Sequence, residues 1–170
     1  HFLVGISLDG TKYVHDRFRT DRAGGGSFER VMHGIKVLQK FNVAFNILTV
    51  VTALTVAHVS EIYRFYKKNK LFFHQFIPCM DPLYSTRGQY AYSLTPEAYG
   101  QFLCNLFDLW YTDITAGNFI YIRYFENLVG MLKGFPPENC GMSGMCVIQH
   151  VIEADGSVYP CDFYVLDDYC

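Results

Sequence analysis

The chain has 170 residues, which suits one domain of ordinary size with a hydrophobic core of its own. Its net charge is −2, and charged residues make up 18% of it while hydrophobic residues make up 51%. This composition excludes intrinsic disorder and a strongly basic nucleic-acid-binding protein. The low charge and the 17% of aromatic residues indicate faces that contact a neighbour. Because the first residues already read as a strand, we expect an internal fragment of a longer chain.

One stretch of the sequence is long enough to span a membrane. Residues 41–60 carry no charge, but asparagine, threonine and histidine side chains interrupt them, and hydrocarbon penalises these groups. The stretch also divides into an apolar strand and the beginning of a helix. No signal peptide pattern is visible. We therefore expect a cytoplasmic protein without membrane contact, whose six cysteines do not form a disulfide scaffold.

The first 115 residues alternate strand and helix signals. Short apolar runs predict strands, and apolar positions at helical spacing predict helices between them. The expected elements are a strand at Val4–Leu8, a polar loop at 11–26, a helix from Ser27 to about Lys40, a strand at Val43–Val51, a helix from about Ala57 to Asn69 and a strand at Leu71–Ile77. This order is typical of parallel βαβ units, so the sequence predicts an α/β fold.

A change of composition follows this region. The expected elements are a helix from Thr95-Pro96 to about Thr115, a helix at Arg123–Lys133, a boundary at Gly134-Phe135-Pro136-Pro137, and a β-hairpin of Val147–Glu153 with Val158–Pro160. Asp155-Gly156 predicts a two-residue turn in this hairpin. We expect one domain at 1–134 and a second at 135–170.

Three cysteines after the boundary could ligate a metal. Cys140, Cys146 and Cys161 are separated by five and fourteen residues, which fits no zinc ribbon, because zinc ribbons use closely spaced pairs. Thiolates on glycine-rich loops suit iron–sulfur clusters. Buried structural thiols are the alternative, and the spacing leaves both interpretations open.

The expected hairpin relates two of these cysteines to each other. A two-residue turn would pair Cys161 with His150 and would bring Cys146 to the same face of the hairpin. The chain would then have to curl before Val147 for both thiols to reach one cluster. Cys79 and Cys104 lie at a strand end and in a helix, so we expect them in the core.

Polar residues follow the first predicted strand at its carboxyl end. In parallel α/β proteins, ligand-binding groups gather at such ends and in the loops after them. Ser7-Leu8-Asp9-Gly10 occupies this position, and Arg19 on the following loop could bind a carboxylate through two hydrogen bonds. A solvated loop with a turn aspartate is the alternative. The three glycines at 24–26 lack a phosphate-binding pattern and indicate a flexible loop.

Four segments carry the most specific patterns of the sequence. They are VGISLDG at 4–10, HDRFR at 15–19, CGMSGMC at 140–146 and VIEADGSVYPCDFY at 151–164. With them the sequence resembles, over essentially its whole length, the anaerobic sulfatase-maturating enzymes, which are radical S-adenosylmethionine (AdoMet) proteins with a SPASM extension. Cys146, Gly156 and Cys161 fit the opening CxnGx4C of the SPASM pattern.

The resemblance implies a fold. Residues 1–134 would be the C-terminal half of a partial (β/α)6 radical AdoMet barrel, with its last three strands, and residues 135–170 the start of the SPASM extension. The CxxxCxxC motif that holds the AdoMet-cleaving cluster does not occur in this sequence, and we expect it upstream. A fourth ligand of the first auxiliary cluster is expected beyond Cys170, so the chain by itself is expected to be inactive.

The resemblance also implies an activity, which is oxidation of a Cys or Ser in a sulfatase polypeptide to formylglycine. A 5′-deoxyadenosyl radical removes a hydrogen atom from the target Cβ, a base accepts the thiol or hydroxyl proton, and auxiliary 4Fe-4S clusters accept the electron. An electron donor such as flavodoxin or ferredoxin is implied as well. By position, the resemblance assigns AdoMet contacts to Ser7, Arg19 and Met80, cluster ligands to Cys140, Cys146 and Cys161, and the base to Asp162.

Two other interpretations stay open. The first is a SPASM enzyme that modifies another peptide, although the match around Cys161-Asp162 argues against it. The second is a non-catalytic, metal-binding interaction module. A CxxxCxxC motif upstream would separate the enzyme interpretations from the module.

Overall fold

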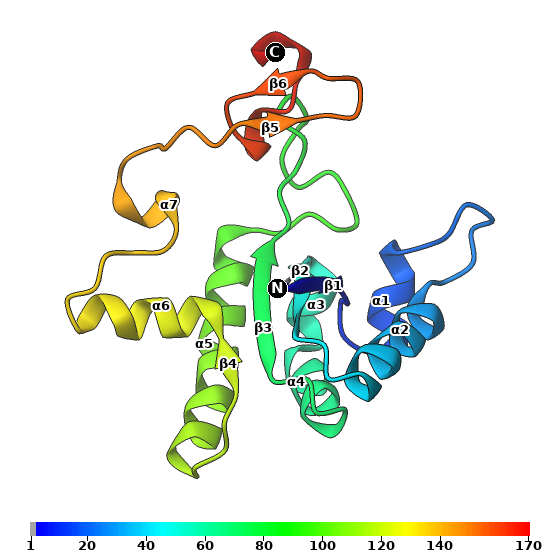
Figure 1. Ribbon diagram of the computed structural model, residues 1–170, viewed down its shortest axis with the longest axis vertical. Coiled ribbons are helices and arrows are strands. Elements are labelled where there is room, and N and C mark those ends of the chain that lie inside the picture. Colours follow the sequence, from blue (N-terminus) through cyan, green and yellow to red (C-terminus); the bar gives the residue numbers. More distant parts are fainter. Residues whose placement is uncertain (1–2) are drawn as a thin grey trace. The chain divides into compact units, whose positions relative to one another are not determined.

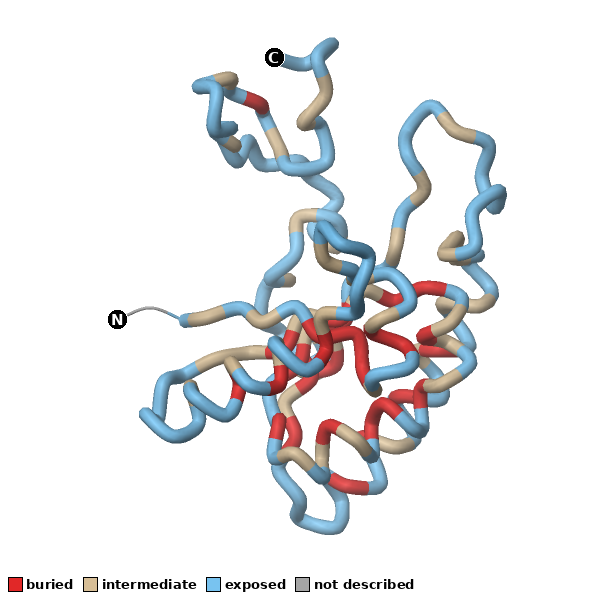
Figure 2. Tube along the Cα trace, turned by 90° about the vertical axis from the view of Figure 1, so that its right-hand side faces the viewer, coloured by how far each residue is buried: buried red, intermediate tan, exposed pale blue. Residues whose placement is uncertain are grey.

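A computed structural model describes residues 3–170 of the chain (Figure 1). It divides into two compact units, the first ending at Glu126 and the second comprising Asn127–Cys170. Figure 2 shows the buried positions gathered in the first unit, and among the described residues of the second unit only Asn127 and Tyr159 are buried. The domain boundary expected after residue 134 stays a prediction.

A parallel sheet organises the first unit. Its four strands are β1 (Val4–Ser7), β2 (Phe45–Val51), β3 (Phe73–Pro78) and β4 (Tyr121–Ile122), in the order β1-β2-β3-β4. All three neighbouring pairs are parallel, which confirms the α/β interpretation. β4 was not predicted, because an apolar run of two paired residues gives no strand signal of its own. The carboxyl ends of β1, β2 and β3 meet at one edge of the sheet (Figure 1).

Helices connect these strands, and one follows the last of them. They are α1 (Lys12–Phe18), α2 (Phe28–Lys40), α3 (Ala53–Ala57), α4 (Val59–Lys68), α5 (Pro96–Thr115) and α6 (Arg123–Leu132), the last of which ends in the second unit. The expectation of a polar loop over 11–26 was wrong, since α1 lies within it. This short helix has no side-chain cap at Thr11, and only Val14 and His15 of its residues are buried, so its pattern is weak. The bounds expected for α5 are confirmed.

The core lies between the sheet and its helices. Alternate residues of β2, namely Ile47, Thr49 and Val51, are buried, as expected for a strand with one covered face. The hydroxyl of Thr49 lies 2.7 Å from that of Tyr66 on α4, and the Tyr66 hydroxyl donates to the carbonyl of Leu8 at 2.6 Å. This buried contact fixes α4 to the carboxyl end of β1. Among residues 3–170, no helix combines the length and the apolar character that a membrane span requires.

The second unit contains a short helix, a hairpin and two 3-10 turns. They are α7 (Cys140–Ser143), the strands β5 (Val151–Ile152) and β6 (Val158–Tyr159), η1 (Asp162–Tyr164) and η2 (Asp167–Tyr169). The strands pair antiparallel, so the predicted hairpin is confirmed.

The register of the hairpin differs by one residue from the prediction. Val151 pairs with Tyr159, and the Glu153 N–H donates to the Ser157 carbonyl, which leaves a loop of three residues. Gly156 lies in the left-handed region with φ 92°, the conformation that such loops require of their last residue. The expected pairing of Cys161 with His150 was therefore wrong, and a one-residue shift also removes the reason to put Cys146 on the same face.

One buried histidine lies in the sheet away from its carboxyl edge. His74 of β3 is 3% exposed and stacks on the ring of Tyr66 with centroids 4.8 Å apart. Its Nδ1 has no hydrogen-bond partner among the described residues. Desolvation by burial lowers the pKa of His74 from 6.5 to about 4.

This pKa predicts an acid-sensitive fold. The unfolded state binds a proton near the ordinary histidine pKa of 6.5 and the folded state only near 4, so stability is complete above the first value and falls as the pH drops toward the second. Between about pH 7.5 and about pH 5 the free energy of unfolding should fall by about 2 kcal/mol through His74 alone. Urea unfolding of the complete protein and of its His74→Phe variant, each at both pH values, measures the loss of unfolding free energy that is due to His74. An equal pH dependence in both proteins would contradict it.

Candidate functional site

An open pocket lies at the carboxyl edge of the sheet in the first unit. Its volume is about 410 Å³. The residues that line it come from the ends of β1, β2 and β3 and from the segments that follow them: Asp9, Phe18, Arg19, Val50, Thr52, Cys79, Met80, Pro82 and Tyr92. This edge is where parallel α/β proteins bind their ligands.

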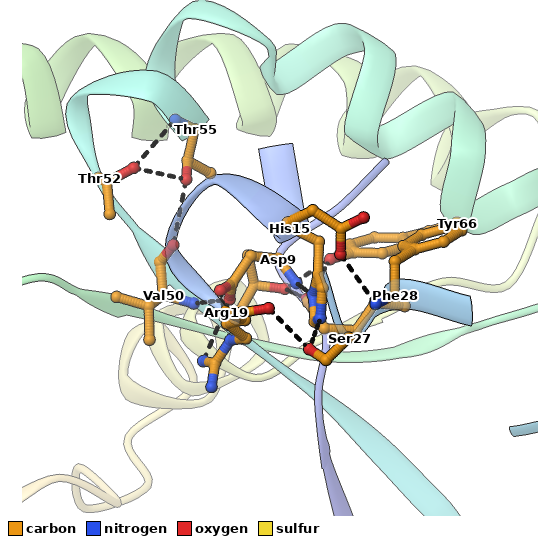
Figure 3. Close-up of polar contacts among 12 residues, drawn as sticks. Asp9, His15, Arg19, Ser27, Phe28, Val50, Thr52, Thr55 and Tyr66 are labelled. Atoms are coloured by element: carbon orange, nitrogen blue, oxygen red, sulfur yellow. Dashed lines mark hydrogen bonds and ion pairs between the residues drawn. The ribbon is translucent and has the colours of Figure 1, made fainter. Parts of the chain in front are cut away.

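Asp9 connects two strands beneath this pocket (Figure 3). It is 7% exposed, and its Oδ1 accepts a hydrogen bond from the backbone N–H of Val50 at 2.8 Å. Arg19 donates to the same carboxylate through Nε, and through Nη2 at 3.3 Å. The alternative of a solvated turn aspartate was wrong, because β2 and Arg19 bury the carboxylate. An acidic residue just after a predicted parallel strand was the signal that marks it as a site residue.

The guanidinium of Arg19 has more hydrogen-bond donors than the Asp9 carboxylate accepts from. A guanidinium carries five N–H groups in a planar fork, and the Asp9 carboxylate uses only the Nε edge. The N–H groups of Nη1 have no partner among residues 3–170, and Arg19 lines the pocket. The pair therefore presents a fixed and partly neutralised guanidinium, which can bind a carboxylate of a ligand.

His15 lies behind this pair and is 0% exposed. Its Nδ1 accepts a hydrogen bond from the backbone N–H of Asp9 at 3.1 Å, and its Nε2 lies 3.0 Å from the hydroxyl of Ser27. That hydroxyl donates to the carbonyl of Arg19 at 2.9 Å, so it accepts from Nε2–H (Figure 3). Desolvation by burial lowers the pKa of His15, which keeps the ring neutral at neutral pH.

The loop before α2 closes on Asp16. The Asp16 carboxylate accepts from the backbone N–H of Phe28 at 2.9 Å and from Nζ of Lys12 at 2.8 Å, so it caps the helix in place of Ser27. A Cβ atom at Gly26 would lie 2.2 Å from Cγ of this carboxylate. The sequence indicated a flexible loop at these three glycines. One of them, Gly26, is required because its backbone lies against the Asp16 side chain and leaves no room for a Cβ.

Comparison with known proteins identifies the relatives of this chain. No family model matches it. It is 53% identical to the cysteine-type anaerobic sulfatase-maturating enzyme of Clostridium novyi (strain NT) over 169 residues, which are 99% of this chain and 45% of the relative. The chain is a homologue of the anaerobic sulfatase-maturating enzymes. The resemblance found in its sequence is thereby confirmed.

More distant relatives and solved structures agree. The serine-type anaerobic sulfatase-maturating enzyme of Bacteroides thetaiotaomicron is 32% identical over 183 residues, covering 99% of this chain and 44% of the relative. The structure of native anSMEcpe with bound AdoMet and Kp18Cys peptide matches with a TM-score of 0.93 and 49% identity, over 99% of this chain and 46% of that chain. The chain spans less than half the length of these relatives. Neither alternative function is favoured by them.

Of the residues of this chain that are predicted to contact AdoMet, two line the pocket and one does not. Arg19 and Met80 both line the pocket, and Met80 is 63% exposed. Ser7 is exposed at the end of β1 and is not among the lining residues. The expectation of a core position was wrong for Cys104, which is exposed on α5. Cys79 is half-buried beside Met80 in the pocket, and desolvation by burial raises the pKa of its thiol.

The predicted cluster ligands all lie in the second unit of this chain. Cys140 and Cys161 are half-buried, Cys146 is exposed, and all three are free thiols. The Cys161 thiol donates to Oδ1 of Asp162 at 3.2 Å. Among residues 3–170, no three side chains of ligand type are gathered as a ready metal site. The chemistry of three thiols in one compact unit fits an iron–sulfur cluster, and their ligand role stays a prediction.

The close approach of Gly26 to Asp16 predicts a selective effect of substitution. Gly26→Ala puts a Cβ against a carboxylate that two hydrogen bonds already hold, so it should destabilise the protein by about 1–3 kcal/mol. Gly34→Ala on α2, the helix that follows, is the control, because its added Cβ would meet no atom within 4 Å other than its chain neighbours and the backbone of its own helix. That variant should be neutral or up to about 1 kcal/mol more stable. Thermal unfolding of both variants measures the difference, and equal stabilities would be the contrary result.

Proposed function

We propose that this chain is part of an enzyme that oxidises a Cys or Ser of a sulfatase to formylglycine, with AdoMet as cofactor. The observation that carries the proposal is the Asp9–Arg19 pocket at the carboxyl edge of a sheet whose fold matches an AdoMet-bound structure. That structure also contains a cysteine peptide, which supports a peptide substrate. We extend the proposal to residues 1–134 as half of a (β/α)6 barrel and to residues 135–170 as the start of a SPASM domain.

The volume and the lining of the pocket support AdoMet as its ligand. Its volume of about 410 Å³ lies within the range of about 300–1,000 Å³ that is usual for small-molecule sites. The unpaired N–H groups of Arg19 suit the carboxylate of the methionine part, and the exposed side chain of Met80 offers an apolar contact. Ser7, the last residue of β1, would add a hydroxyl to the same ligand.

In the second unit, Cys140, Cys146 and Cys161 would hold three irons of an auxiliary 4Fe-4S cluster. When bound, AdoMet and the clusters supply the one-electron chemistry of the oxidation, and a flavodoxin or ferredoxin would supply the electron that begins it. Asp162 would accept the proton of the target thiol or hydroxyl. Its carboxylate accepts a hydrogen bond from the Cys161 thiol, and ligation of that thiol as a thiolate would leave the carboxylate free to act as a base.

The function is tested on the complete, anaerobically reconstituted protein with sulfatase peptides that carry Cys or Ser at the target position. Asp162→Asn keeps the size of the side chain and removes its basicity, so formylglycine formation should fall by roughly 10²-fold or more. AdoMet binding and iron content should not change. Asp167→Asn, on the adjacent 3-10 turn, is the matched control and should keep wild-type turnover. Wild-type turnover in a fully clustered Asp162→Asn protein would show that the proton leaves by another route.

The cluster assignment has a separate test that needs no activity. Simultaneous replacement of Cys140, Cys146 and Cys161 by Ala should lower the bound iron of the complete protein by one cluster's worth, because thiolates are the preferred ligands of iron–sulfur clusters. Cys104→Ala removes an exposed thiol of the first unit and should leave the iron unchanged. Unchanged iron in the triple variant would refute the assignment.

A further inference from the structure

A buried histidine lies directly behind the pocket without lining it. His15 is 0% exposed, and both of its ring nitrogens are engaged within the protein. Its ring also packs edge-on against Phe28, with centroids 5.9 Å apart. A residue needed only to fill this space could be apolar, since a buried polar group stabilises a fold only when its hydrogen bonds are complete. The two polar contacts therefore require an explanation of their own.

The first contact reaches Asp9. His15 Nδ1 accepts a hydrogen bond from the backbone N–H of Asp9 at 3.1 Å. The carboxylate of the same Asp9 accepts hydrogen bonds from Arg19 and from the Val50 N–H. The hydrogen bond to His15 fixes the peptide from which the Asp9 side chain extends. Without it, a buried N–H would be left without a partner at the carboxyl end of β1.

The second contact reaches Arg19. The His15 Nε2–H group donates to the Ser27 hydroxyl, and this hydroxyl donates to the Arg19 carbonyl at 2.9 Å. The same carbonyl accepts the backbone N–H of Ser27 at 3.1 Å, while the Arg19 N–H donates to the carbonyl of His15 at 3.0 Å. The ring thus accepts on the side of Asp9 and donates on the side of Arg19. Only the neutral tautomer with its proton on Nε2 satisfies both contacts (Figure 3).

We propose that His15 is a positioning residue for carboxylate recognition in the pocket, because it holds the backbones of Asp9 and Arg19 in the arrangement that aims the Arg19 guanidinium. This inference rests on the proposed binding of AdoMet. It names the part of that ligand which His15 affects, namely the α-carboxylate of the methionine portion, and leaves the adenosine portion unaffected.

The test compares two substitutions of similar size in the complete, clustered protein. His15→Asn keeps an acceptor close to the place of Nδ1, whereas His15→Leu removes both hydrogen bonds. The two probes are AdoMet and 5′-methylthioadenosine, which keeps the adenosine and the S-methyl group but has a neutral thioether in place of the sulfonium and lacks the chain that carries the carboxylate. His15→Leu should weaken AdoMet binding by about tenfold or more, because a misplaced Arg19 loses hydrogen bonds to a charged carboxylate, each of which is worth at least about that factor. It should leave methylthioadenosine binding unchanged, and His15→Asn should restore most of the AdoMet affinity.

A matched control separates positioning from stability. His74→Leu replaces another buried histidine of the same unit, one that does not line the pocket and stacks on Tyr66 and Phe76, so it should change the melting temperature without changing either affinity. Ser27→Ala removes the link to Arg19 from a half-buried position and gives a second variant should His15→Leu not fold. It should weaken AdoMet binding several-fold, again without an effect on methylthioadenosine.

The contrary results are distinct. Unchanged AdoMet affinity in His15→Leu and Ser27→Ala would overturn the inference. Equal losses for both probes, or no rescue by His15→Asn, would also overturn it, since they would mean a general packing effect. Failure of the wild-type, clustered protein to bind AdoMet would instead refute the proposed function.

Discussion

The pocket depends on one buried carboxylate. Asp9 lies two residues after the end of β1, and its side chain accepts hydrogen bonds from the Val50 N–H on β2 and from two nitrogens of Arg19. A charge removed from water costs several kcal/mol unless it is paired and hydrogen-bonded, and here both conditions are met. The same carboxylate connects neighbouring strands, fixes the guanidinium that faces the pocket, and leaves part of that guanidinium free. The fold and the lining of the pocket are thus coupled through a single side chain.

Much of the first unit could be predicted from its sequence, because its signals are local. Apolar runs mark β1, β2 and β3, and Thr95-Pro96 marks the beginning of α5, where the Thr95 hydroxyl caps the helix. Elements with weak local signals were missed. α1 has seven mostly polar residues, and β4 owes its two paired residues to the neighbouring β3. The hairpin of the second unit was found, but its register depends on a loop of three residues that Asp155-Gly156 alone does not specify.

In the candidate site, too, the residues with a local sequence signal were predicted and the others were missed. Arg19 lies in one of the quoted motifs, Met80 was assigned by position from the family resemblance, and both line the pocket. Asp9 was weighed as a turn residue, because its burial depends on Val50, forty-one residues away in the sequence. His15 was not singled out, since a single histidine on a short helix carries no signal until its two partners are known. Residues that belong to a local motif are therefore visible in a sequence, whereas residues that contact them from distant parts of the chain are not.

The most direct test of the pocket as the AdoMet site uses Cys79, a half-buried thiol in its lining, with Cys104 on α5 as an exposed reference in the same unit. Both cysteines can be alkylated in the complete, clustered protein under anaerobic conditions and followed separately by peptide mass spectrometry. Saturating AdoMet should slow the alkylation of Cys79 several-fold, because a bound ligand covers the thiol, and should leave the rate at Cys104 unchanged. Equal alkylation rates of Cys79 with and without AdoMet would contradict a binding site in this pocket.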